Sequence, residues 1–116
     1  MECVYLIRAE KTNLYKIGVT KTNVKHRLKA SQTGNPYKLT IKEIYPTDIS
    51  FKIETVLRRR LVEKKYISED FDNLMGEWYE FNQKDVENFK DQCQKIEDQL
   101  KFLDKNSTYF KLDGQI

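Results

Sequence analysis

The spacing of hydrophobic positions changes several times along the chain, and each change predicts a secondary-structure element. Residues 4–7 and 14–19 are rich in β-branched and aromatic side chains, and a short polar stretch separates them, so we expect an antiparallel hairpin. A third strand is expected over 39–45, where apolar residues alternate before the turn at Pro46. The aromatic segment 78–81 is expected to be a short strand or an extended piece.

Three further segments have the apolar spacing of amphipathic helices. The first covers 24–31, after capping residues within 20–23, and the turn at 33–36 ends it. The second is expected to take its cap from 46–48, and its apolar stripe consists of Ile53, Val56, Leu57 and Leu61. The third is expected over 83–103, capped by Asn82, and its apolar residues are Val86, Phe89, Cys93, Ile96, Leu100 and Leu103.

This order of elements predicts an α+β domain with a small three-stranded antiparallel sheet flanked by helices and a long C-terminal helix. A chain of 116 residues has room for one such domain. We expect residues 1–82 to form it and residues 83–116 to be a helix and tail packed on it or extending from it. Trp78 is interpreted as a core residue below the sheet, with base stacking as the alternative.

Gaps of three and four residues make the apolar positions of 86–103 a heptad seam. Such a seam can pack on its own domain, which is the commoner arrangement. It can also pair two copies of the chain, so a homodimer through 86–103 is the alternative.

Charge is distributed unevenly along the chain, although the net charge is only +3. Residues 1–65 carry fifteen Lys/Arg against six Asp/Glu, a net +9, and residues 66–116 carry six against twelve, a net −6. A basic half of this kind indicates a polyanionic partner, although lysine-rich composition can also serve solubility alone.

Composition excludes several classes of protein. Four glycines and two prolines exclude collagen-like and low-complexity chains, and no apolar run has the ~20 residues that span a bilayer. The N-terminal residues are interpreted as a strand, not as a signal peptide. Cys3 and Cys93 have no metal-type spacing, which favours a reduced, cytoplasmic protein without a membrane partner.

An ordered set of short motifs resembles the GIY-YIG nuclease superfamily, in particular its small phage- and virus-borne branch. The set covers about residues 3–82 and begins with Val4-Tyr5-Leu6 and Tyr15-Lys16-Ile17-Gly18. It continues with Arg27-Leu28, with 32–36 (Gln-Thr-Gly-Asn-Pro), with Glu54, and with 76–79 (Gly-Glu-Trp-Tyr). No single motif is specific, but the ordered set at these spacings is.

The resemblance implies metal-dependent cleavage of DNA and assigns roles by position. Glu54 matches the ligand of a single Mg²⁺ or Mn²⁺ ion, and Arg27 matches the arginine that neutralises the scissile phosphate. Tyr5 matches the tyrosine that helps to deprotonate or orient the attacking water. Gly18 matches the motif glycine, where the backbone passes close to the site.

Two positions depart from the family pattern. Lys16 stands directly before Ile17-Gly18, where the second motif has tyrosine, and we take Lys16 as its equivalent because Tyr15 would face the other side of a strand. Arg58 stands where this branch often has histidine. The late asparagine of the family has two candidates, Asn73 and Asn82.

The residue types agree with this chemistry without the family name. Hydrolysis of a phosphodiester requires charge neutralisation on the phosphoryl oxygens and an activated water, and a carboxylate-held cation with a nearby guanidinium supplies the first. An amine or phenol can accept the proton only if its pKa is lowered. Basic residues beside the site would contact DNA phosphates, and we expect Lys25, Lys29, Arg58 and Arg59 to do so.

Simpler interpretations remain for the same residues. Glu54 and Arg58 are four apart on a helix and could form an ordinary surface ion pair, and Tyr5 could be only a core aromatic. We therefore expect a Mg²⁺-dependent endonuclease acting on DNA, with double-stranded DNA as the expected form, in the cytoplasm of the host cell if the protein is viral. The alternative is a GIY-YIG-fold module, catalytically weak or inactive, that binds nucleic acid or a protein.

Overall fold

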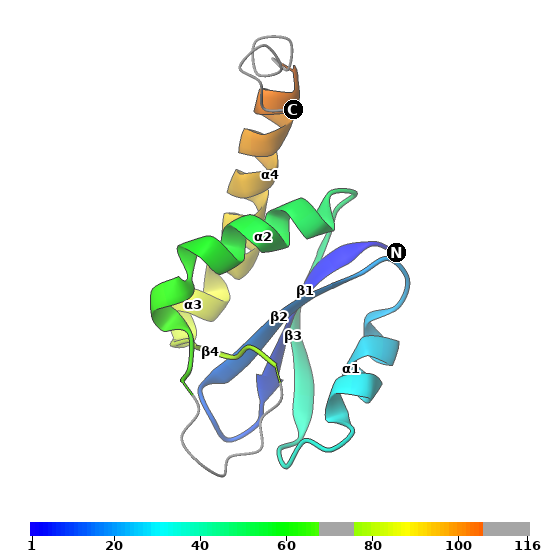
Figure 1. Ribbon diagram of the computed structural model, residues 1–116, viewed down its shortest axis with the longest axis vertical. Helices are drawn as coiled ribbons and strands as arrows, with labels where there is room; N and C mark the ends of the chain where they lie inside the picture. Colours follow the sequence, from blue (N-terminus) through cyan, green and yellow to red (C-terminus); the bar gives the residue numbers. More distant parts are fainter. Residues whose placement is uncertain (68–75, 106–116) are drawn as a thin grey trace.

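The computed structural model describes residues 1–67 and 76–105, in which strands and helices follow the predicted order (Figure 1). The aromatic segment becomes a strand, so the sheet has four strands where the sequence predicted three. The elements are β1 (Cys3–Ala9), β2 (Leu14–Thr20), α1 (Val24–Gln32), β3 (Leu39–Pro46), α2 (Ser50–Arg60), the 3₁₀ turn η1 (Val62–Lys64), β4 (Tyr79–Glu80), α3 (Gln83–Glu87) and α4 (Phe89–Lys105).

The sheet has the strand order β3-β1-β2-β4, and its pairs are antiparallel. The predicted α+β class with a small antiparallel sheet and a long C-terminal helix is therefore confirmed. β4 pairs only with Leu14 and Tyr15 of β2. The remainder of β2, from Lys16 to Thr20, is thus an edge that β4 does not cover.

Helices cover both faces of the sheet (Figure 1). We call the two sides the α1 face and the α2/α4 face, after the helices packed on them. Along the central strand β1, Tyr5 and Ile7 belong to the core on the α1 face, whereas Val4 and Leu6 belong to the core on the other. Trp78 is buried on the α1 face, which confirms its interpretation as a core residue.

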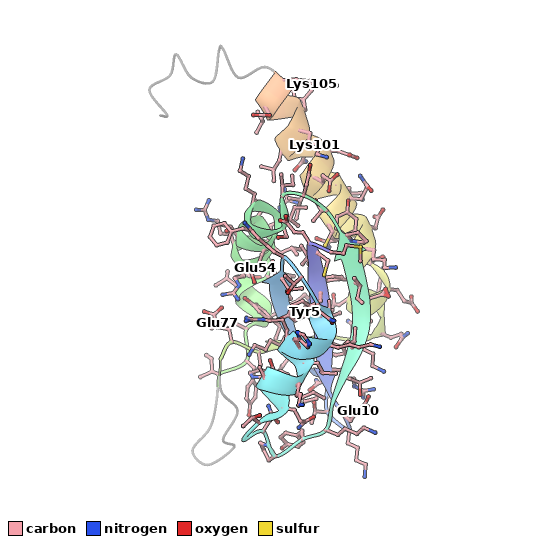
Figure 2. All side chains as sticks on the ribbon, turned by 90° about the vertical axis from the view of Figure 1, so that its right-hand side faces the viewer. Tyr5, Glu10, Glu54, Glu77, Lys101 and Lys105 are labelled. Carbon is pink, nitrogen blue, oxygen red and sulfur yellow. The ribbon has the colours of Figure 1, made fainter. Side chains whose placement is uncertain are left out.

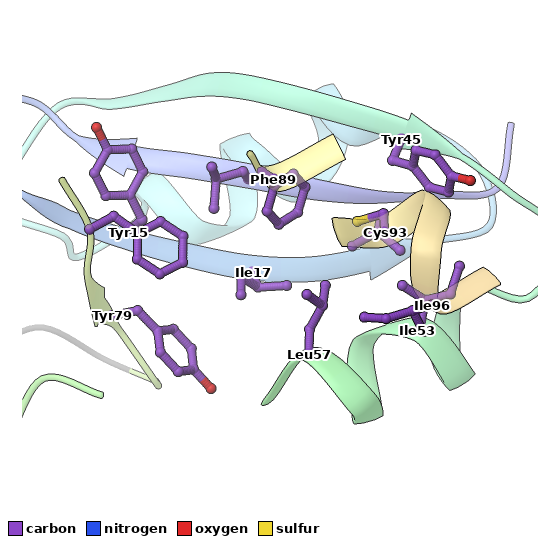
Figure 3. Packing of buried hydrophobic residues seen from close by; sticks show 12 residues of the cluster. Tyr15, Ile17, Tyr45, Ile53, Leu57, Tyr79, Phe89, Cys93 and Ile96 are labelled. Atoms are coloured by element: carbon purple, nitrogen blue, oxygen red, sulfur yellow. The ribbon is translucent and has the colours of Figure 1, made fainter. Parts of the chain in front are cut away.

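The core on the α2/α4 face joins residues that are far apart in the sequence (Figure 3). Ile17 of β2, Leu57 of α2 and Phe89 of α4 are all buried in it. The C-terminal helix therefore packs on the sheet instead of only extending from it. Beyond the sheet, the last turns of α4 project away from the rest of the chain (Figure 1).

The cap of α2 does not come from residues 46–48, contrary to the prediction. The helix begins after Ile49, which makes no side-chain cap of its own. Glu2 caps it instead, because its carboxylate accepts hydrogen bonds from the Ser50 amide at 3.1 Å and the Ser50 hydroxyl at 2.6 Å. These two bonds hold the pKa of the Glu2 carboxyl below its usual value. The start of α2 is thus tied to the N-terminus of the chain.

The single helix predicted over 83–103 is interrupted at Asn88, which separates α3 from α4. Asn82 caps α3 as predicted, and with Asp85 it forms a capping box. The interruption lies one residue before Phe89, the first α4 residue buried in the core. Asparagine is a weak helix former and tolerates such an interruption well.

The heptad seam is used mainly within its own domain, as in the commoner of the two arrangements. Phe89, Cys93 and Ile96 are buried in the core, and only the far end of α4 exposes large apolar side chains, at Phe102 and Leu103. Pairing of two copies through the whole of 86–103 would require these buried residues to leave the sheet. The predicted tail at 106–116 lies outside the described residues.

Gly18 is required by the ring of Tyr5, its cross-strand partner. A Cβ atom at position 18 would overlap with the ring and the hydroxyl of Tyr5. We expect Gly18→Ala to destabilise the protein by about 1–3 kcal/mol, the usual cost of overpacking, as measured by urea denaturation. In the Tyr5→Leu background, Gly18→Ala should lower the free energy of unfolding by less than it does in the wild type, because the tyrosine ring is gone. Additive losses would show that the overlap is not the cause.

Candidate active site

Three of the predicted site residues lie on the α1 face of the sheet. Tyr5 and Gly18 face each other across β1 and β2, and Lys16 lies two residues before Gly18, on the same side. Tyr15 lies on the opposite face, where its ring stacks on Phe81 at a centroid distance of 5.4 Å. The parity of the strand therefore places Lys16, and not Tyr15, beside Tyr5.

Tyr5 is largely a core residue, since only 2% of its surface is exposed. Its hydroxyl makes no hydrogen bond to any residue in the described ranges. The hydroxyl is nevertheless not fully buried, because Arg58 Nε is the only fully buried side-chain polar atom of these ranges that lacks a partner. The small exposed part of Tyr5 thus includes the hydroxyl.

Lys16 is held in a partly buried position beside Trp78 and Gly76. Its ammonium lies 5.9 Å from the centroid of the Trp78 ring, and a Cβ atom at Gly76 would lie only 3.1 Å from the same ammonium. Gly76 also has a positive φ of 89°, which favours glycine. Burial lowers the pKa of Lys16 from its usual value, and the positive charges of Arg27 and Arg58 lower it further.

Glu54 lies on α2 next to the buried stripe and is itself 9% exposed. One carboxylate oxygen accepts a hydrogen bond from Arg58 at 3.2 Å, so the predicted i,i+4 ion pair is present. Burial raises the pKa of the Glu54 carboxyl above its usual value, while Arg58 and Arg27 oppose this rise. The Glu54 carboxylate is thus largely buried, unlike the carboxylate of an exposed surface pair.

Arg27 reaches the same region from the other layer of the fold. It is an exposed residue of α1, and its charge acts on both Lys16 and Glu54. Arg27 is therefore near enough to influence the pKa of both groups, although Lys16 lies on β2 and Glu54 on α2. Figure 2 shows Glu54 and Glu77 on the same flank of the molecule.

Lys25 and Lys29 lie on the opposite flank of α1 from Arg27, because positions two residues apart on a helix point in nearly opposite directions. Together with Gln32 and Thr33 they line a shallow depression on the outside of α1. The structure thus separates these two lysines from the residues around Glu54.

Glu77 joins the site although the sequence analysis did not select it. Its carboxylate accepts hydrogen bonds from Arg58 at 3.3 Å, from Lys65 at 3.3 Å and from the Tyr79 hydroxyl at 3.4 Å. Its place in the segment 76–79 was a usable signal, since residues two apart on an extended chain share a side and Tyr79 follows Glu77 at that interval.

A groove of about 420 Å³ opens beside Arg58, between the last turn of α2, η1 and β4. Arg59, which was predicted to contact DNA, lies in this groove, on the other side of Arg58 from Glu54. The groove is lined by Arg58, Arg59, Val62, Lys65, Glu77 and Tyr79.

Two carboxylates could hold a hard cation here. Glu54 and Glu77 both bond to Arg58, and the charge of Glu77 contributes to the raised pKa of Glu54. In the described part of the chain no group of three or more His, Cys, Asp or Glu side chains gathers in a metal-binding arrangement. Mg²⁺ is commonly held by one or two carboxylates with several waters, so this donor set fits it once Arg58 leaves the Glu54 oxygen.

Of the two asparagine candidates, Asn82 is used as the cap of α3, and Asn73 lies outside the described residues. His26 is exposed on α1. Within 1–67 and 76–105, every helix falls short of the length or the apolar character needed to traverse a bilayer.

Comparison with known proteins identifies the family. No curated protein and no solved structure matches the chain. A family model described as the T5orf172 domain, a phage-associated domain of an endonuclease-related group, matches residues 2–97. The match includes every predicted site residue and runs past 82 into α4. Because it covers most of the 116 residues, the chain belongs to the T5orf172 domain family.

Proposed function

We propose that this protein is a GIY-YIG-type endonuclease that hydrolyses phosphodiester bonds of DNA with Mg²⁺ or Mn²⁺. The observation that supports this proposal best is the charge of Arg27 acting on both Lys16 and the buried Glu54, with Lys16 on the same side of the sheet as Tyr5. A carboxylate, a guanidinium and an amine with a lowered pKa are the groups that such a hydrolysis requires.

In this proposal Glu54 holds the cation, with Glu77 beside it. A divalent cation bound there supplies Lewis-acid stabilisation of the phosphoryl oxygens and lowers the pKa of a coordinated water. Arg27 donates hydrogen bonds to the phosphate and offsets the negative charge that develops as water attacks phosphorus. The P–O bond to the leaving oxygen breaks as the new P–O bond forms.

Lys16 and Tyr5 handle the proton of the attacking water. An amine accepts a proton only in its neutral form, and burial together with two neighbouring arginines favours that form of Lys16. Tyr5 can orient the water through its hydroxyl. DNA contacts are assigned to Arg58 and Arg59 near the site, and to the two lysines of the outer α1 depression, Lys25 and Lys29.

A binding module without catalysis is the second candidate, and one observation favours it. Arg58 donates to Glu54 at 3.2 Å and so occupies an oxygen that a cation would need. A protein in which this pair persists on DNA would bind the polyanion without hydrolysing it. Salt-sensitive DNA binding with no Mg²⁺-dependent nicking of supercoiled plasmid would identify this candidate.

A pair of α1 variants tests the role of Arg27. We expect Arg27→Ala to lower kcat for plasmid nicking by about 10²–10³-fold, because a preorganised donor to the developing charge is lost. Lys29→Ala removes an equal charge from the opposite flank and should raise KM with little change in kcat. Equal effects of the two variants on kcat would contradict the assignment of Arg27.

A further inference from the structure

The groove between α2, η1 and β4 has the size and chemistry of a site for an anionic ligand. Its volume of about 420 Å³ lies within the ~300–1,000 Å³ range of small-molecule sites. Val62 and Tyr79 provide apolar surface, and the charged lining comprises Arg58, Arg59, Lys65 and Glu77.

Among the described residues that line the groove, positive charges outnumber negative ones. Glu77, the one carboxylate among the described residues that line the groove, is shared by Arg58 and Lys65. Arg59 is exposed, and no carboxylate of the described residues pairs with it. Three cations facing one carboxylate leave an excess of donors, which a phosphate group would satisfy.

Arg58 connects this groove to Glu54. One terminal nitrogen of its guanidinium donates to Glu54 at 3.2 Å, and the other donates to Glu77 at 3.3 Å. Its Nε is buried and has no hydrogen-bond partner among residues 1–67 and 76–105. A ligand in the groove would therefore share the Arg58 side chain with whatever binds at Glu54.

We propose that the groove binds a phosphate flanking the scissile one on the same DNA strand, with Arg59 and Lys65 as its direct contacts. Arg58 then lies between the two phosphates. The proposal rests on the proposed function only in naming the scissile phosphate at Glu54, because binding in the groove requires neither metal nor cleavage.

Neighbouring residues provide a matched control. Arg60 lies next to Arg59 but donates to Gln99 of α4 at 2.9 Å, and Lys64 lies next to Lys65 but pairs with Asp85 of α3 at 3.2 Å. The variants R59Q/K65Q and R60Q/K64Q thus remove the same two charges from the same segment. Only the first pair removes them from the groove.

The experiment measures the affinity for a fluorescent DNA duplex by anisotropy, without divalent metal, between 50 and 200 mM salt. For R59Q/K65Q we expect the slope of log K against log salt to become shallower by about 0.9, the value for one lost phosphate contact. For R60Q/K64Q the slope should stay at that of the wild type. Equal slopes in the two double variants would overturn the proposal.

The outcomes also separate the groove from the endonuclease. If the slopes are equal and the wild type shows Mg²⁺-dependent nicking, the groove is not a phosphate site but the proposed endonuclease function stands. If the slope changes only in R59Q/K65Q and no divalent metal supports nicking, the groove is a phosphate site but the proposed endonuclease activity is contradicted.

Discussion

Glu54→Gln is expected to lower Mg²⁺-dependent plasmid nicking by about 10³-fold. Glutamine keeps the shape of the side chain and can still accept a hydrogen bond from Arg58, but it lacks the charge that holds a hard cation. Metal assistance is worth several kcal/mol, and each ~1.4 kcal/mol corresponds to a factor of ten in rate. Initial rates of nicking at saturating Mg²⁺ would measure the loss.

The control for this substitution is Glu43→Gln on β3, the other edge strand of the sheet. It removes one carboxylate far from β2 and should leave the nicking rate unchanged. The affinity for Mn²⁺, followed by electron paramagnetic resonance, should fall in Glu54→Gln only. Equal rates for Glu54→Gln and the wild type after rigorous purification would contradict the metal-ligand assignment.

Phe89→Ala is expected to destabilise the whole protein by about 3–5 kcal/mol, the usual cost of truncating a core phenylalanine. Phe89 is 2% exposed and packs in the same cluster as residues of β1, β2 and α2 (Figure 3). Removing its ring leaves a cavity between the helices and the sheet. Urea denaturation followed by circular dichroism would measure the loss as a single transition.

The matched control is Phe51→Ala on α2, since that phenylalanine is 70% exposed. Its effect should stay within about 0.5 kcal/mol, as for most surface substitutions. If Phe89→Ala instead costs less than Phe51→Ala, or unfolds in two transitions, then α4 is an appendage that the rest of the domain does not need.

The acidic half of the chain has a structural use that its net charge did not indicate. Glu97 of α4 accepts hydrogen bonds from the Tyr45 hydroxyl at 3.1 Å and from the Thr47 hydroxyl at 2.6 Å. Burial, together with the nearby Glu97 charge, raises the pKa of Tyr45 to about 12. These bonds attach α4 to the end of β3, so this carboxylate of the acidic half holds the fold together.

Local patterns predicted most of the elements. Period-two runs are typical of strands, and spacings of three and four residues are typical of helices, because each regular backbone returns its side chains to one face at that interval. These rules located the three long strands, α1 and α2, and the Asn23 and Asn82 caps. The same parity rule separated Lys16 from Tyr15 on β2.

The errors concern contacts between distant parts of the chain. Glu2 caps a helix that begins 48 residues later, and no local signal relates the two positions. The interruption at Asn88 depends on where Phe89 enters the core, and β4 becomes a strand only because β2 offers it an edge. Local propensity carries no information about these partners.

For the candidate site, the sequence by itself determined the residue types and the element that carries each one: Tyr5 and Lys16 on strands, Arg27 and Glu54 on helices. Only the tertiary structure decided which of them meet. It let the charge of Arg27 act on Glu54, left Lys25 and Lys29 on the opposite flank of α1, and bonded Glu77 to Arg58 beside Glu54. The reason is that the energy of a charge interaction in a solvated protein decreases steeply with the distance between the two groups. The packing of both helix layers on the sheet sets that distance.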